Sequence, residues 1–233
     1  MGGMAKDETQ GDAEQPRYVI VAPTFNHGRF LQGVLRALAS FGMTVIVVDD
    51  GSGDETAEVL GDWAAGGSER IAVEHPENRG KGAALRSGFA EAERRGFTHA
   101  ATIDTDGQHD PGDLRALLDA SRREPRALVV GARPRKVAGY PAAGRIGRWL
   151  SNRLVRIESG VRVDDSQSGM RVYPLAGLRM LGARAGRYAF ETEVLTRAGW
   201  AGMSVVEVPI GCVYRMPLGR VSHFRITDRK SVV

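Results

Sequence analysis

Residues 99–120, HAATIDTDGQHDPGDLRALLDA, contain the turn from which both the fold and the chemistry of this chain can be argued. The apolar run from Ala100 to Ile103 suits a buried strand, and the segment after the turn has the spacing of a helix. Between them, Asp104 and Asp106 lie two residues apart, so both carboxylates can reach one cation. Mg²⁺ and Mn²⁺ prefer oxygen ligands and usually share them with a phosphorylated substrate. The stretch therefore predicts a strand, a metal-binding turn and a helix, although an isolated motif of this kind is more often a turn of solvated acids.

The same alternation of strand and helix runs along the chain. Short apolar runs suited to buried parallel strands occupy residues 18–25, 44–50, 70–75, 99–104 and 127–131. Segments of helical period lie between them, and Ser52 or Asp54 could cap the second helix. The pattern predicts a single-domain α/β fold with a mostly parallel sheet flanked by helices. Ligands of such sheets bind at the carboxyl ends of the strands.

Composition limits the class of protein and the cellular compartment that are expected for this chain. Its 233 residues, 42% of them hydrophobic, suffice for one sizeable core. No apolar run approaches the roughly 20 residues of a membrane-spanning helix, and the first residues lack the apolar core of a secretion signal. The single cysteine, Cys212, excludes an internal disulfide. We expect a cytoplasmic protein with a disordered leader at residues 1–16, a folded domain at 17–215 and a basic tail at 216–233.

Charge is unevenly distributed along the chain. Residues 1–144 hold 17 Lys and Arg against 21 Asp and Glu, a balance of −4, whereas residues 145–233 hold 15 against 7, a balance of +8. Nucleic acid, an anionic membrane surface or a phosphorylated lipid would each be attracted by the second part. A solvated basic face without a partner is the competing interpretation.

Residues 144–158, GRIGRWLSNRLVRIE, are predicted to form a helix with two faces. At about 100° per residue, one face is apolar and another is polar. The apolar stripe consists of Ile146, Leu150, Leu154 and Ile157, and the polar face of Arg145, Arg148, Asn152 and Arg156. Guanidinium groups bond phosphate oxygens in pairs, so this polar face suits a phosphate.

Three further loops follow predicted strands. Residues 22–28, APTFNHG, and 47–56, VVDDGSGDET, offer turn residues, hydroxyls and acceptors for a base or a ribose. Residues 77–88, ENRGKGAALRSG, place Arg79 and Lys81 at a helix start, where a phosphate is favoured. This loop lacks the spacing of a P-loop, and no G-x-G-x-x-G opens the first βα turn, so neither an ATPase nor a dehydrogenase is supported.

Five motifs in order, APTFNHG, VVDDGSGDET, NRGKGAA, DTDGQHDP and DSQSGMRVYP, resemble glycosyltransferase family 2 of the GT-A fold. The similarity covers residues 18–210 and is closest to the dolichyl-phosphate mannose synthase and bacterial polyprenyl-phosphate glycosyltransferase branch. It implies an inverting, metal-dependent enzyme that moves a sugar from a nucleotide-diphosphate sugar to a phosphorylated polyprenol or another lipid or glycan acceptor. Together with the lack of an apolar run long enough to span a membrane, the resemblance leads us to expect peripheral contact with the cytoplasmic face of a membrane and no nucleic-acid partner.

The resemblance assigns roles by position. The donor site comprises Pro23, Thr24, Asn26, Asp50, Gly51, Ser52, Arg79, Lys81 and Asp104, and the metal site Asp104, Asp106 and Gln108, with Mg²⁺ or Mn²⁺ as the cation. The acceptor site comprises Arg145, Arg148, Ser151, Asn152, Ser168 and Arg171. Met170 and His27 stand where the family commonly has Phe and Glu.

The chemistry depends on the acceptor. Asp106 is assigned to catalysis through the metal, and Asp165 would be the general base if the acceptor were a hydroxyl. Glu191 and Glu193 are weaker alternatives as a base. A nucleotide-sugar binding module without transfer activity is the competing function.

Overall fold

The computed structural model describes residues 15–134, 142–186 and 189–212. The predicted tail, nearly all of the predicted leader and most of the segment between Arg133 and Arg145 lie outside these residues. The predicted domain bounds therefore stay predictions.

Strands and helices alternate through most of the described chain. The strands are β1 (Tyr18–Thr24), β2 (Val45–Asp49), β3 (Arg70–Glu74), β4 (His99–Thr102), β5 (Leu128–Ala132), β6 (Arg171–Pro174) and β7 (Val205–Pro209). The helices are α1 (Gly28–Ala39), α2 (Thr56–Ala64), α3 (Lys81–Arg94), α4 (Leu114–Arg123), α5 (Ala142–Ser159), α6 (Leu175–Leu181) and α7 (Ala189–Trp200), with a 3₁₀ turn, η1 (Pro111–Asp113), before α4.

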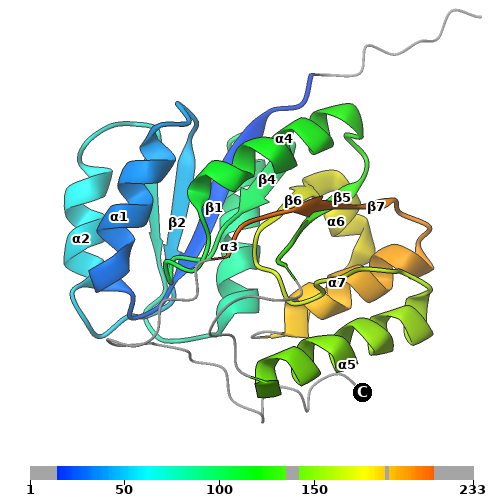
Figure 1. The fold of residues 1–233 in the computed structure, drawn as a ribbon. Helices are drawn as coiled ribbons and strands as arrows, with labels where there is room; N and C mark the ends of the chain where they lie inside the picture. The colour runs from blue at the N-terminus through cyan, green and yellow to red at the C-terminus, as the bar shows by residue number, and fades with distance from the viewer. Residues whose placement is uncertain (1–14, 135–141, 187–188, 213–233) are drawn as a thin grey trace, which may run out of the picture.

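The strands form one seven-stranded sheet in the order β3-β2-β1-β4-β6-β5-β7 (Figure 1). All neighbouring pairs are parallel except those of β6, which runs antiparallel to β4 and β5. The chain builds outward from β1 to β3 and then returns to place β4 on the other side of β1. In open α/β sheets, ligands bind where the strand order reverses in this way. The carboxyl ends of β1 and β4 are therefore the expected ligand site.

Helices cover both faces of the sheet. Buried side chains of α1, α2 and α4 pack on one face around Ile20, Val47 and Ile103. Those of α3, α6 and α7 pack on the other around Val21, Val48 and Tyr173. Helix α5 packs against α7 on the outer side of this second layer (Figure 1). It lies below the sheet in that view, at the edge where β1 and β4 end.

The five predicted strands and the helices between them are confirmed by the structure. The two proposed caps of the second helix are wrong, because its N-cap residue is Glu55, which makes no side-chain cap bond. Asp54, one position earlier, accepts a hydrogen bond from the Thr56 backbone N–H at 3.0 Å. Strands β6 and β7 were not predicted. β6 is four residues long and contains Arg171 and Pro174. β7 lies at the sheet edge and contains Glu207, so neither strand has the continuous apolar run of a central strand.

Candidate functional site

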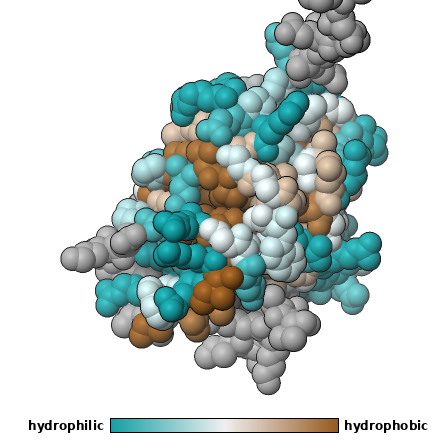
Figure 2. Space-filling model, turned by 90° about the vertical axis from the view of Figure 1, so that its right-hand side faces the viewer, coloured by the Kyte–Doolittle hydropathy of each residue, from teal (hydrophilic) through white to brown (hydrophobic). Residues whose placement is uncertain are grey.

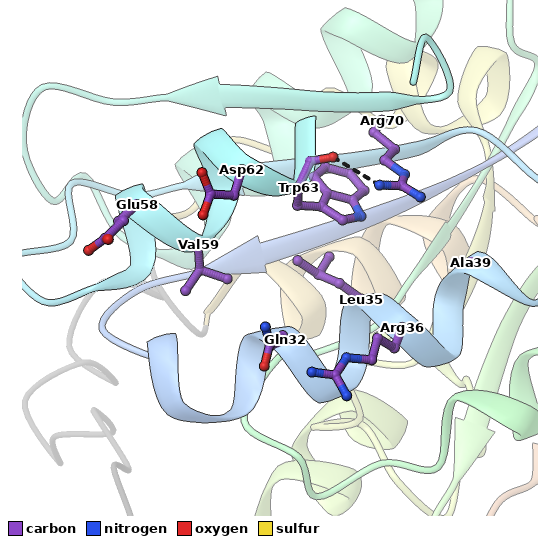
Figure 3. Close-up of a pocket in the computed structure, with 9 residues that line it drawn as sticks. All are labelled: Gln32, Leu35, Arg36, Ala39, Glu58, Val59, Asp62, Trp63 and Arg70. Atoms are coloured by element: carbon purple, nitrogen blue, oxygen red, sulfur yellow. Dashed lines mark hydrogen bonds between the residues drawn. The ribbon is translucent and has the colours of Figure 1, made fainter. Parts of the chain in front are cut away.

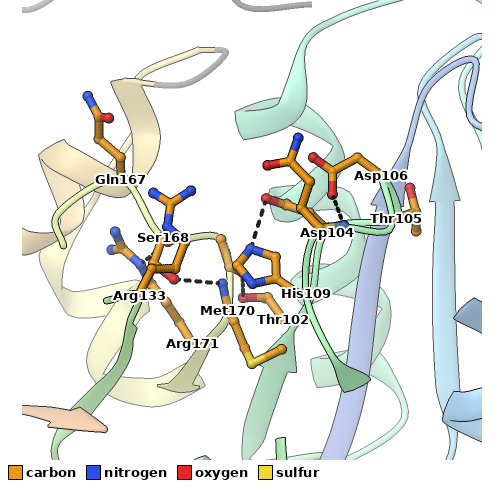
Figure 4. Close-up of polar contacts among 12 residues, drawn as sticks. Thr102, Asp104, Thr105, Asp106, His109, Arg133, Gln167, Ser168, Met170 and Arg171 are labelled. Atoms are coloured by element: carbon orange, nitrogen blue, oxygen red, sulfur yellow. Dashed lines mark hydrogen bonds and ion pairs between the residues drawn. The ribbon is translucent and has the colours of Figure 1, made fainter. Parts of the chain in front are cut away.

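The turn carrying Asp104 and Asp106 leaves β4 and is tied to the loop after β1. The Thr105 side chain between the two acids is fully buried and donates to the Pro23 carbonyl at 3.1 Å. It also contacts His27 Nδ1 at 2.9 Å. The backbone N–H of Gln108 donates to Asp106 Oδ1 at 3.0 Å (Figure 4). These bonds hold the two acids at the switch point of the sheet.

Lys81 links this turn to two helices. Its Nζ, at the start of α3, lies 2.6 Å from Asp104 Oδ1 and 2.7 Å from Glu191 Oε1 on α7. Burial opposes the charge of Lys81, yet the two carboxylates raise the pKa of Lys81 above its ordinary value. Burial likewise works against Asp104, but Lys81 holds the pKa of Asp104 well below its usual range. Burial and the charge of Asp104 raise the pKa of Asp106. The site is thus a charged cluster with Asp104 ionised.

The donor atoms of the turn fit a hard divalent cation. Asp104 and Asp106 supply carboxylate oxygens from one loop, as Mg²⁺ and Mn²⁺ require. His109 is buried beside them, with Nε2 4.0 Å from Asp104 Oδ2 (Figure 4). Its Nδ1 has no hydrogen-bond partner among the described residues. No group of three or more His, Cys, Asp or Glu side chains within residues 15–134, 142–186 and 189–212 is arranged as a complete metal site.

The predicted nucleoside loops are bonded to one another. Asn26, whose φ of 52° is left-handed, donates its backbone N–H to Ser52 Oγ at 2.8 Å. Its side-chain oxygen accepts from the Gly53 N–H at 2.8 Å. Pro23 and Thr24 end β1 beside them, and Thr24 is buried. The structure therefore brings the first two predicted loops together at the carboxyl edge of the sheet.

Asp50 connects the second loop to the third. Its buried carboxylate accepts from the backbone N–H groups of Arg79 at 3.0 Å and Gly80 at 2.7 Å, and contacts His75 Nδ1 at 2.7 Å. Asp50 thus binds the protein's own backbone in this structure, while the Arg79 side chain is exposed. Contact of either residue with a nucleoside stays a prediction.

The predicted base, Asp165, is enclosed between two arginines. Its carboxylate is fully buried and is bonded on both oxygens by Arg133, Nε at 2.5 Å and Nη2 at 2.9 Å. Arg148 Nη1 lies 3.5 Å away. Burial would raise the pKa of Asp165, but the hydrogen bonds and charge of Arg133, with the charge of Arg148, hold it below the ordinary value. An ionised carboxylate held by a bidentate guanidinium is a weak proton acceptor, so this geometry favours an anchoring role over that of a base.

The other predicted acceptor residues divide into two groups. On α5, Arg148 is buried and donates to the Pro134 carbonyl at 3.1 Å, whereas Arg145 is exposed. Ser151 Oγ accepts a hydrogen bond from Ser166 Oγ, and Asn152 Oδ1 accepts one from the Ser166 backbone N–H, both at 2.9 Å. These bonds fasten α5 to the loop that carries Asp165.

Arg171 holds the same loop from the other side. Its guanidinium is fully buried, and its three nitrogens donate to the carbonyls of Ser168, Ser166 and Glu191 at 2.8–2.9 Å. Ser168 is also fully buried, and its Oγ faces the backbone N–H of Met170 at 3.4 Å. The structure gives both residues a part in shaping the loop.

Gly169 joins the acceptor loop to the metal turn. A Cβ added at this position would lie 2.3–2.5 Å from the carboxylate atoms of Asp104. The Gly169 carbonyl accepts from Thr102 Oγ1 at 2.7 Å. Only glycine allows this close approach. The loop of Asp165 and the turn of Asp104 therefore form one continuous site.

Sequence reasoning missed two of these residues and undervalued a third. Arg133 directly follows β5, so the rule that ligands meet the carboxyl ends of strands could have identified it. Nothing in the sequence distinguished His109 as a site residue within its acidic loop. Glu191 was expected to be an acid at a helix start or a weaker candidate for the base, and its ion pair with Lys81 was not foreseen because the two residues are 110 positions apart in the sequence.

A separate hollow lies between α1 and α2 (Figure 3). It has a volume of about 430 Å³ and is lined by residues of these two helices and by Arg70, which donates to the Trp63 carbonyl at 3.2 Å. It contains none of the predicted site residues.

Comparison with known proteins identifies the family. The sequence profile of Glycosyl transferase family 2 matches residues 19–181. The UDP-N-acetylglucosamine–dolichyl-phosphate N-acetylglucosaminyltransferase of Methanococcus voltae is 29% identical over 220 residues, covering 87% of each chain. The polyprenol monophosphomannose synthase of Mycolicibacterium smegmatis is 31% identical over 226 residues, covering 88% of this chain and 83% of the relative.

A solved structure agrees with the fold. Glucosyl-3-phosphoglycerate synthase from Mycobacterium tuberculosis, crystallised with Mn²⁺, UDP and glucosyl-3-phosphoglycerate, superposes with a TM-score of 0.64 at 19% identity, over 87% of this chain and 73% of that one. Three observations favour transfer activity over a binding module. The family profile matches more than half of the chain, the sheet has the GT-A arrangement, and Asp104 and Asp106 are both present. The chain belongs to glycosyltransferase family 2 and is a glycosyltransferase of the GT-A fold.

Proposed function

We propose that this enzyme transfers a sugar, with inversion, from a nucleotide-diphosphate sugar to a polyprenyl phosphate. The observation that carries the proposal is the contact of Gly169 with Asp104, because it joins an arginine-lined loop to the carboxylates of the donor side. The Methanococcus and Mycolicibacterium relatives are named for dolichyl phosphate and a polyprenol, which supports the same acceptor class.

The donor side is assigned to the loops bonded around β1, β2 and α3. Asp104 and Asp106 would hold Mg²⁺ or Mn²⁺, and Gln108 is the proposed third ligand. A cation bound there would supply positive charge to neutralise the diphosphate leaving group. Lys81 keeps Asp104 ionised and oriented, since its Nζ is fixed between Asp104 and Glu191.

The acceptor side is assigned to Arg133 and Arg148. Asp165 fixes Arg133 through two hydrogen bonds, so the guanidinium is already oriented before a phosphate arrives. A phosphate monoester is ionised near neutral pH, so its oxygen can attack the anomeric carbon without a general base. This agrees with a carboxylate at Asp165 that is engaged on both oxygens. The attack takes place on the face opposite the departing diphosphate.

A membrane is the natural location of such an acceptor. None of the described helices has the length and apolar character to cross a bilayer. We propose peripheral contact at the cytoplasmic face, with polyprenyl phosphate drawn from the membrane.

The test is a transfer assay with the full chain, Mn²⁺, a panel of UDP- and GDP-sugars, and farnesyl phosphate as a short soluble acceptor. We expect a glycosyl-phosphate product by mass spectrometry, and its loss in Asp106→Ala. Arg148→Lys keeps the charge but removes the guanidinium fork, so it should raise KM for farnesyl phosphate with a smaller effect on donor hydrolysis. Transfer to farnesol but never to farnesyl phosphate would refute the acceptor class.

A further inference from the structure

Helix α5 presents its apolar side chains to the outside. The side chains of Ile146, Trp149, Leu150, Leu154 and Ile157 are 65%, 62%, 39%, 46% and 68% exposed. The stripe of an ordinary surface helix faces the core instead. Figure 2, which views the side at the right of Figure 1, shows hydrophobic residues at the surface in its lower part, where α5 ends. This exposed set is called the α5 outer face below.

The orientation of α5 follows from its polar residues. Arg148 reaches inward to Asp165, and Asn152 bonds the Asp164 carbonyl at 2.7 Å and the Ser166 backbone. Val155 is the fully buried apolar residue on this inner side. At its end the helix packs closely on α7, where a Cβ at Gly199 would lie 2.7 Å from Ser159. Because the inner side is committed to the acceptor loop, the apolar stripe must point outward.

Basic residues border the α5 outer face. At about 100° per residue, Arg145 and Arg156 fall together on one margin, with Trp149 next to them. Arg153 lies between Trp149 and the apolar stripe, and its guanidinium carbon is 6.0 Å from the Trp149 ring centroid. All three arginines are exposed. Glu158, the one acid of α5, lies at the opposite margin beyond Leu154.

This pattern matches one kind of partner. A helix with a broad apolar side, bordering arginines and a tryptophan lies in the plane of a membrane surface, with its apolar side among the acyl chains. Anionic headgroups complement the arginines. A second copy of the chain fits less well, because two-fold pairing of this face would bring arginines of both copies together.

We propose that the α5 outer face docks on the surface of a membrane containing anionic lipids. The proposal rests on the proposed function in one respect. The inner side of the same helix carries Arg148, Ser151 and Asn152, so docking would hold the acceptor site at the depth of lipid headgroups, where the phosphate of a polyprenyl phosphate lies. The outer face thus supplies the membrane contact and the inner side the phosphate contact.

The first experiment measures flotation of the full chain with vesicles of phosphatidylcholine alone or with 30% phosphatidylglycerol, a composition chosen to model an anionic leaflet of the kind that attracts basic residues. Wild type should bind the anionic vesicles. The double variant Ile146→Gln, Ile157→Gln should bind at least about 10-fold more weakly, because apolar surface is removed without new charge. Arg153→Gln with Arg156→Gln should lose roughly 30-fold on anionic vesicles only, as expected for two basic residues near such a surface.

A matched control uses an exposed apolar residue elsewhere. Met180 is 86% exposed on α6, which follows the antiparallel strand β6 and therefore starts at the opposite edge of the sheet. Met180→Gln should bind vesicles as wild type does. Equal binding by the isoleucine variant and wild type, or no binding by wild type, would overturn the proposal. So would a dimer in solution that the isoleucine variant abolishes.

A second readout separates this proposal from the proposed function. The isoleucine variant should keep wild-type transfer to soluble farnesyl phosphate and lose transfer to undecaprenyl phosphate embedded in vesicles. Failure of all transfer, with vesicle binding as expected, would remove the proposed function and leave the docking surface standing. Loss of both transfer activities in the isoleucine variant would count against a role confined to docking.

Discussion

The role of Asp165 can be decided by Asp165→Asn. If Asp165 anchors Arg133, the variant removes the negative charge that this largely buried guanidinium bonds, since Asn can accept one of the two hydrogen bonds but carries no charge. Removing one partner of a buried ion pair costs about 3 to 5 kcal/mol in the free energy of unfolding. For a chain of this size that corresponds to a fall in Tm of roughly 6 to 20 °C, at about 2 to 4 °C per kcal/mol.

The pH dependence supplies a second signature. The pKa of Asp165 is lower in the folded state than its ordinary value of 3.8. Its contribution to stability is therefore complete above that value and is lost as the pH falls through the folded-state pKa. On acidification, wild type should lose the contribution of ionised Asp165 to the free energy of unfolding. Asp165→Asn should show no such loss, because the variant has no carboxylate at this position.

The assay is urea unfolding followed by circular dichroism, with Asp165→Asn, Arg133→Met and the double variant as a thermodynamic cycle. Contacting residues of this kind should show a coupling energy of about 0.5 to 3 kcal/mol. The reasoning would be refuted if Asp165→Asn unfolded at the same urea concentration as wild type while its kcat collapsed. That outcome is what a general base would give.

Three further predictions concern other parts of the site and the fold. Gly169→Ala should weaken Mn²⁺-dependent binding of the nucleotide that wild type binds, UDP or GDP, about 10-fold or more by calorimetry, a loss of about 1.4 kcal/mol. The reason is that its Cβ would lie 2.3–2.5 Å from the Asp104 carboxylate, and unchanged binding would contradict this close contact. Gly51→Ala should destabilise the chain by more than about 1 kcal/mol, since φ is +73° and the Cβ would lie 2.4 Å from the Glu77 backbone. The neighbouring Gly53→Ala, with nothing within 4 Å, is its control and should be tolerated in thermal unfolding. Glu91→Gln should lower the free energy of unfolding by up to about 1 kcal/mol at neutral pH. The reason is that hydrogen bonds from Arg94 and Arg95 lower the pKa of Glu91 to about 2 from 4.5. In urea titrations, the difference in stability from wild type should shrink as the pH falls between these two values.

Local sequence patterns were sufficient for much of the fold. Continuous apolar runs identified β1, β2, β4 and β5, because a strand covered on both faces has no polar side to display. The short run of β3 was recognised with them, although this strand lies at the sheet edge and is only partly buried. The acid turn after β4 was recognised because side chains two residues apart can share a ligand. Strands β6 and β7 were not predicted from the sequence. β7 lies at the edge of the sheet and β6 runs antiparallel between two other strands, and these positions are defined only by the neighbouring strands.

The sequence by itself determined which residue types stand at the carboxyl ends of the strands, and with them the family and the class of reaction. Tertiary structure alone decided how these side chains are used. Asp165 became the partner of Arg133 across 32 positions, and Lys81 met Glu191 across 110. The direction of α5 was likewise settled by Arg148 and Asn152 bonding a distant loop, which turns the apolar stripe outward. Periodicity records which residues share a face of a helix, but only the packing partner determines which face is buried.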